Sequence, residues 1–154
     1  SIQLQQLVAL YPANSRFQLR LMSLLIIMDD YHGTLRTISG YLDISKSPAE
    51  PDLSLTKIWK VRAYLGLGKT QLAANTFNEI SAVFRDARDD LPNWGVAWYV
   101  LTDGQLHDLA SRRDQALGAY REILSIAKDT YVSDNILEAA RAGLSEPYQI
   151  QPKP

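Results

Sequence analysis

One helical pattern recurs three times along this chain of 154 residues, and it constrains the fold more than any other feature. Each copy has an apolar helix, a short polar turn and a second helix that opens on small residues. The clearest copy runs from 56 to 84 and turns at Gly68, while the other two turn at Asp29 and Ser111. A helix pair of this kind cannot bury its apolar face alone, so the pattern predicts pairs that stack on their neighbours.

Small side chains take the same place after each of the three turns. They are Thr34, Ala73 and Ala116, separated by 39 and 43 residues. We expect close contact between helices at Ala73, Ala74, Ala116 and Ala119, since small residues let two helices approach. Apolar residues recur at helical spacing, and no segment alternates with a period of two for long enough to predict a strand. The sequence therefore predicts an all-α fold.

Composition indicates one core and argues against two classes of partner. Hydrophobic residues make up 46% of the chain, enough to bury a continuous core. The 16 basic and 17 acidic residues nearly cancel, which gives no electrostatic case for binding nucleic acid or an anionic membrane surface. The longest apolar run, Leu24 to Met28, is far below the ~20 residues that span a bilayer, so we expect no membrane insertion. The absence of cysteine excludes disulfides and thiolate chemistry.

We expect one helical domain over residues 1–148. The first segment looks like the closing helix of a repeat that lacks its first helix, so we expect the chain to be a fragment of a longer protein. The predicted parts are the end of an incomplete repeat at 1–12, helix pairs at 14–43, 54–91 and 94–128, a capping helix at 134–146 and an extended tail at 149–154. The loop before the second pair contains Ser47-Pro48-Ala49-Glu50, a capping-box pattern, so that helix begins either there or near Ser54.

One string imitates a phosphate-binding loop. Residues 63–70 read AYLGLGKT, with Lys69 and Thr70 where a nucleotide hydrolase holds phosphate and metal, and residues 24–30 read LLIIMDD, like a strand that ends in a magnesium-binding aspartate. A phosphate loop needs a strand before a glycine-rich turn, whereas helical spacing continues into this string. An ATP- or GTP-binding protein that uses Lys69 and Thr70 remains the alternative of another class.

The sequence contains no complete pattern for a catalytic or metal-binding site elsewhere. The two histidines are His32 and His107, and only Asp103 lies one helical turn from His107 on the same side. One histidine and one aspartate make an incomplete metal site. We therefore expect a non-enzymatic protein without a catalytic set, cofactor or metal.

The repeated pattern resembles the tetratricopeptide repeat (TPR) family. The string from Ala63 to Phe77, AYLGLGKTQLAANTF, looks like the end of a first helix, its glycine turn and the small-then-aromatic start of a second helix. The departures are spacings longer than the usual ~34 residues, an incomplete Trp-Leu-Gly signature, and Asp29 and Ser111 in place of the turn glycine. The resemblance implies a right-handed α-solenoid of TPR-like antiparallel hairpins with a C-terminal capping helix.

In that family the first helix of each pair lines a concave groove that binds a protein or peptide segment. Carried over through the alignment on the turns, the resemblance implies that the partner contacts are Arg16, Arg20, Trp59, Arg62, Trp98, Gln105 and Asp108. Core packing between adjacent helices is the alternative role for the two tryptophans. The lysine and asparagine clamp with which the family grips a peptide C-terminus is not visible.

The function that follows is a protein–protein interaction scaffold that binds a partner segment in the groove. A further alternative is an assembly module, because an uncapped repeat edge at the N-terminal helix would expose apolar surface and favour self-association.

Overall fold

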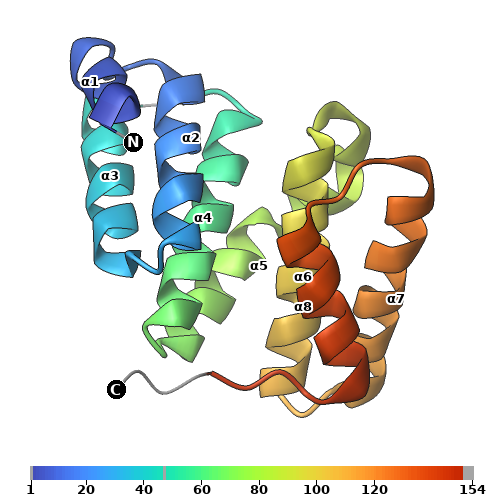
Figure 1. Ribbon diagram of the computed structural model, residues 1–154. Helices are drawn as coiled ribbons and strands as arrows, with labels where there is room; N and C mark the ends of the chain where they lie inside the picture. Colours follow the sequence, from blue (N-terminus) through green and yellow to red (C-terminus); the bar gives the residue numbers. More distant parts are fainter. Residues whose placement is uncertain (1, 47, 151–154) are drawn as a thin grey trace. The chain divides into compact units, whose positions relative to one another are not determined.

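The computed structural model describes residues 2–46 and 48–150 (Figure 1). Its α-helices are α1 (Ile2–Leu10), α2 (Ser15–Ile27), α3 (Tyr31–Ile44), α4 (Asp52–Gly66), α5 (Thr70–Asp86), α6 (Asn93–Leu109), α7 (Arg113–Asp129) and α8 (Asp134–Ser145), with a short 3₁₀ helix η1 (Arg88–Asp90). No strand occurs in the described ranges, and the predicted all-α fold is confirmed. The predicted capping residue Ser47 and most of the predicted tail, 151–154, lie outside the described residues.

The start of α4 and the end of α5 differ from the predicted boundaries. Helix α4 begins at Asp52, between the two predicted starts, and the hydroxyl of Ser54 donates to Oε2 of Glu50 at 2.7 Å. Helix α5 ends at Asp86, and the chain then tightens into η1 before Pro92. A 3₁₀ turn commonly closes an α-helix, and proline cannot continue one, so this pair ends earlier than residue 91.

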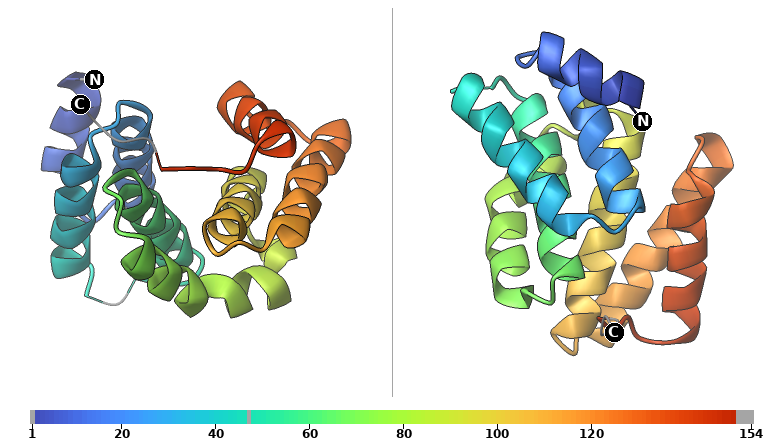
Figure 2. Two further views of the ribbon diagram at one scale, coloured as in Figure 1. Left: turned by 90° about the horizontal axis from the view of Figure 1, so that it is seen from below. Right: turned by 60° about the vertical axis from the view of Figure 1, so that its left-hand side comes forward.

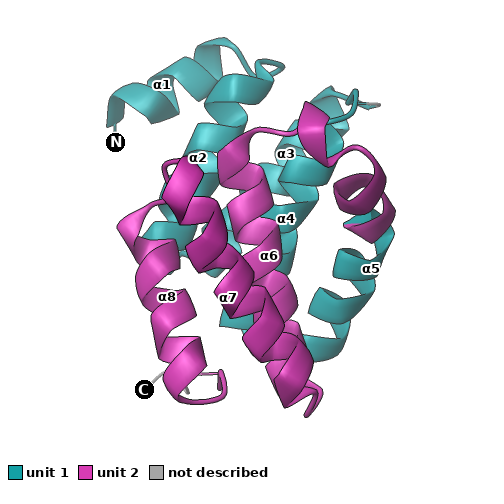
Figure 3. Cartoon of the chain, turned by 90° about the vertical axis from the view of Figure 1, so that its right-hand side faces the viewer, with its two compact units in different colours: residues 1–80 teal, residues 81–154 magenta. Residues whose placement is uncertain are grey.

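The chain divides into two compact units, residues 1–80 and 81–154, and the division falls inside α5 (Figure 3). A single domain over 1–148 stays a prediction.

All three predicted turns have the same backbone conformation. Asp29, Gly68 and Ser111 have φ values of 58°, 73° and 60°, in the left-handed region that normally favours glycine. In each turn the amide of this residue donates to the carbonyl three residues earlier, and the next amide donates to the carbonyl five residues earlier. This pair of bonds is the Schellman arrangement, which satisfies carbonyls at a helix end. The aligned sequence copies therefore adopt one local structure.

Burial repeats in the same register. Thr34, Ala73 and Ala116, each five residues after the left-handed residue, have 0% exposure. Ile38, Phe77 and Tyr120 follow them in sequence and are also buried. The second helix of each copy thus turns the same face inward. Of the alanines predicted at close helix contacts, Ala73, Ala116 and Ala119 are buried and Ala74 is half-buried.

In the first unit, α2, α3 and α4 pack on one another. Figures 1 and 2 show α2 and α3 side by side; α4 packs on both of them. Their apolar stripes meet through residues such as Met22, Ile38 and Ile58, all nearly without exposed surface. Helix α1 packs on α2 and buries none of its residues.

In the second unit, α6, α7 and α8 each pack on the other two. The Tyr120 ring of α7 has 0% exposure and lies against Gly104 of α6 and Gly143 of α8. A Cβ atom at Gly104 or Gly143 would lie 2.8 Å or 2.5 Å from ring atoms, so only glycine admits the ring at this distance. The end of α5 joins this unit through Phe84, whose ring stacks on Tyr99 at 4.3 Å.

Candidate functional site

A buried carboxylate joins three parts of the second unit. Asp108 lies in the last turn of α6, and its side chain has 0% exposure. Its Oδ2 atom accepts hydrogen bonds from the Tyr120 hydroxyl at 2.7 Å and from the Tyr148 amide at 2.9 Å. Nη1 of Arg113 lies 3.0 Å from both carboxylate oxygens. Asp108 therefore fixes α7 and the segment after α8 to the end of α6.

These contacts set the charge state of the carboxylate. Burial by itself raises the pKa of Asp108, but the hydrogen bonds from Tyr148, Tyr120 and Arg113, with the Arg113 charge, lower it below the ordinary value. The pKa of Tyr120 is raised far above its ordinary value by burial and by its hydrogen bond to Asp108. At neutral pH an ionised Asp108 accepts from a neutral Tyr120.

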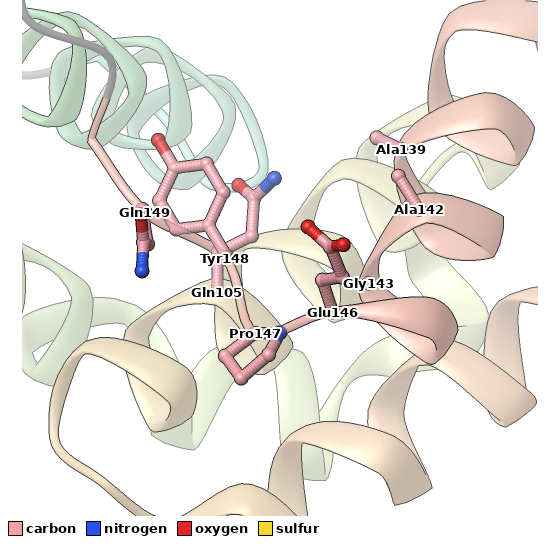
Figure 4. Close-up of a pocket in the computed structure, with 8 residues that line it drawn as sticks. All are labelled: Gln105, Ala139, Ala142, Gly143, Glu146, Pro147, Tyr148 and Gln149. Atoms are coloured by element: carbon pink, nitrogen blue, oxygen red, sulfur yellow. The ribbon is translucent and has the colours of Figure 1, made fainter.

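A pocket of about 460 Å³ lies beside this network, between α6, α8 and the extended segment after α8 (Figure 4). Its lining residues are Gln105, Ala139, Ala142, Gly143, Glu146, Pro147, Tyr148 and Gln149. Figure 4 shows the carboxylate of Glu146 and the carboxamide of Gln105 pointing to the same side of the segment. The pocket is thus lined by polar side chains and by alanine methyl groups.

Four of the predicted contact residues lie in the first unit. Arg16 and Arg20 are exposed on α2, and Arg62 is half-buried on α4. Trp59 on α4 has 2% exposure and belongs to the core. Helices α2 and α4 pack on each other, so the two predicted first helices of this unit are neighbours.

The other three predicted residues lie on α6 in the second unit. Trp98 is half-buried, while Gln105 has 4% exposure and lines the pocket. Asp108 has its carboxylate oxygens engaged within the unit. The structure therefore brings Gln105 and Asp108 together with the segment that ends in Tyr148 and Gln149, and we assign Asp108 a structural role.

The string that imitates a phosphate loop is a helix end. Residues 63–66 belong to α4, and the amides of Gly68 and Lys69 donate to the carbonyls of Leu65 and Tyr64 at 3.0 Å and 2.9 Å. Phosphate binding by such a loop needs amides that face the ligand, whereas these two are used by the helix. Lys69 is exposed in the turn, and the apolar run 24–27 lies in α2.

His107 has a polar neighbour at each ring nitrogen. Nε2 lies 3.3 Å from Oδ1 of Asp103, and Nδ1 accepts from Nε of Arg112 at 2.9 Å. Burial raises the pKa of Asp103 above its ordinary value, although His107 lowers it in part. Within residues 2–46 and 48–150 no group of three or more histidine, cysteine or acidic side chains is placed to hold a metal ion.

The segment Glu146–Gln149 forms a wall of the pocket, whereas the sequence predicts only an extended tail that begins at Gln149. One feature of the sequence does indicate a buried polar network near this segment. Asp108 occupies the same position before the turn as Ile26 and Leu65, which are both buried apolar residues. A charged residue at a core position predicts a buried polar network, because an unpaired charge there is costly.

The chain matches no protein-family model, no curated protein and no solved structure. Among the described helices, none is both long and apolar enough to cross a membrane.

Proposed function

We propose that the protein is a non-enzymatic scaffold of TPR-like hairpins, stacked as a right-handed solenoid, that binds a segment of a partner protein. The observation that carries the proposal is that one turn structure occurs three times. Each turn has a left-handed residue, at Asp29, Gly68 or Ser111, and the same pair of hydrogen bonds around it. Repeated hairpins with this register present their first helices next to one another. The packing of α2 on α4 and of α6 on α8 supports such a stack within each unit.

The proposed contact surface has a part in each unit. In the first unit it consists of Arg16, Arg20 and Arg62, which are exposed or half-buried on first helices. In the second unit it consists of Trp98 and Gln105 on α6 with the pocket next to Gln105. Arginine and tryptophan are frequent energetic anchors of interfaces, which makes Arg20, Arg62 and Trp98 the first residues to test.

Site-specific photo-crosslinking tests the proposal. A photoreactive residue at Arg20, Arg62 or Gln149 should capture one and the same partner protein in cells that express the chain. Matched positions on second helices, Arg36 and Arg121, are also exposed and should not capture it. With the purified partner, Arg62→Ala and Trp98→Ala should each weaken binding by ~2 kcal/mol or more. Equal capture at all five positions, or parental affinity in both variants when folded, would reject the proposed surface.

A second candidate function, assembly through the N-terminal helix, is favoured by the apolar surface of α1. Ile2 and Leu10 are 74% and 71% exposed, and Tyr11 is 55% exposed. Sedimentation velocity of the parent and of Leu10→Lys tests this function. A parent oligomer that dissociates in the variant would favour assembly, and a monomeric parent at high concentration would reject self-association.

A further inference from the structure

The pocket of the second unit contains one negative charge and no lining cation. Among the eight residues drawn in Figure 4, Glu146 is the only one with a carboxylate, and none is a lysine, arginine or histidine. No described lysine, arginine or histidine forms an ion pair with Glu146. A carboxylate in a concave wall without a counter-charge favours a ligand group that is positively charged.

The other walls suit a long side chain with a flat cationic end. The methyl groups of Ala139 and Ala142 can contact an aliphatic stem. The Tyr148 ring lies beside Gln105 in Figure 4, where it offers an aromatic face. A guanidinium can donate two parallel hydrogen bonds to one carboxylate and can stack on an aromatic ring, and an ammonium cannot do both.

The position of Glu146 is fixed on both sides. Before it, Gly143 packs directly against the buried ring of Tyr120. After it, the Tyr148 amide is held by Oδ2 of Asp108 at 2.9 Å. The Glu146 amide itself donates to the Ala142 carbonyl at 2.9 Å at the end of α8. The carboxylate is therefore presented by an ordered backbone, which lowers the entropy lost on binding.

We infer that this pocket receives an arginine side chain of an extended segment of the partner protein. The inference rests on the proposed function, since it specifies which residue of the bound segment enters the second unit. A volume of about 460 Å³ also leaves room for the residues that flank the arginine.

Titration of the whole chain by ¹⁵N NMR tests the inference. The probe is a pentapeptide, acetylated and amidated at its ends, with arginine at its centre between alanines. The matched peptide contains citrulline, which keeps the shape of arginine without its charge. At millimolar concentrations the arginine peptide should shift the amide signals of Glu146, Tyr148 and Gln149 saturably. The citrulline peptide should bind about fivefold more weakly.

Two variants separate the charge of the pocket from charge in general. Glu146→Gln should abolish the preference for arginine over citrulline. Glu138→Gln removes an exposed carboxylate from α8, outside the pocket, and should keep the preference. Methylguanidinium alone should bind more weakly than the peptide, because the inference assigns the site to a protein segment.

Any of four results would overturn the inference: no saturable shift, equal affinity for the two peptides, a preference that survives in Glu146→Gln, or methylguanidinium binding as tightly as the peptide. The proposed function is judged separately by the crosslinks at Arg20 and Arg62, which belong to the first unit and do not line the pocket. If the titration fails while those crosslinks still form, the inference that the pocket receives an arginine is rejected and the proposed scaffold function is not.

Discussion

The backbone amide of Tyr148 donates a 2.9 Å hydrogen bond to Oδ2 of Asp108, 40 residues earlier in the chain. The same oxygen accepts from the Tyr120 hydroxyl, so one buried carboxylate holds α6, α7 and the segment after α8 together. Because the backbone amide of Tyr148 donates this bond, its side chain remains available to line the pocket.

Asp108→Asn should destabilise the protein by about 2–3 kcal/mol at pH 7. The new NH₂ group would face groups that are themselves hydrogen-bond donors, and Arg113 would lose its counter-charge. Urea unfolding of parent and variant measures the difference. The pKa of Asp108 is lowered in the folded state, so its contribution is fully present above the unfolded pKa and is lost as pH falls through the folded pKa. The difference in unfolding free energy between parent and variant should therefore become smaller below about pH 4. A difference that stays constant from pH 7 to pH 3 would contradict an ionised, hydrogen-bonded Asp108.

Gly104→Ala and Gly143→Ala should each cost ~1–3 kcal/mol, because the new methyl group would overlap the Tyr120 ring. The ring cannot move away easily, since it has 0% exposure and its hydroxyl is held by Asp108 at 2.7 Å. Gly118→Ala is the matched control. A Cβ atom there meets nothing within 4 Å, so alanine should stabilise α7 by about 0.5–1 kcal/mol. Thermal unfolding of the three variants measures these changes, and equal midpoints would contradict the close packing of α6 and α8 on Tyr120.

The three turns and the residues that follow them could be predicted from the sequence, because their determinants are local. A left-handed turn residue, a small residue five positions later and a helical apolar stripe lie within one stretch of chain. The return of Tyr148 to Asp108 could not be predicted in this way. It depends on the packing of α8 on α6 and α7, and an extended segment has no periodic pattern that indicates its partner.

The predicted contact residues also combine a feature that the local sequence determines with one that depends on tertiary packing. Alignment on the turns places each of them on a first helix, yet burial depends on what packs above that helix. Trp59 and Arg62 lie one turn apart on α4, but Trp59 is in the core and Arg62 is half-buried. A helical period gives the direction of a side chain to within a wide arc, and the neighbouring helices decide its exposure.

Ser111→Gly should stabilise the protein by about 0.5–1 kcal/mol, and Gly68→Ala should destabilise it by ~1 kcal/mol. Both residues have positive φ, 60° and 73°, where a Cβ atom meets the following carbonyl. Ser111 is the better test than Asp29, whose carboxylate also accepts a hydrogen bond from the Tyr31 hydroxyl at 2.7 Å. Guanidinium unfolding curves of the two variants measure the changes. Shifts of the same sign would show that the two turns do not share one conformation in solution.

Lys69→Ala should leave both the stability and any nucleotide response of the protein unchanged. Lys69 is exposed in a turn, and its amide and that of Gly68 are already bonded to the carbonyls of Tyr64 and Leu65. A phosphate would have to displace these bonds, which close α4, so we expect no saturable heat when magnesium-ATP or magnesium-GTP is titrated into the parent. Lys57→Ala is the control, because Lys57 forms a 2.9 Å ion pair with Glu79 and its loss measures an ordinary lysine contribution. Micromolar binding of either nucleotide that disappears in Lys69→Ala and persists in Lys57→Ala would replace the scaffold proposal with a nucleotide-binding function, since only a rearranged turn could then hold the phosphates.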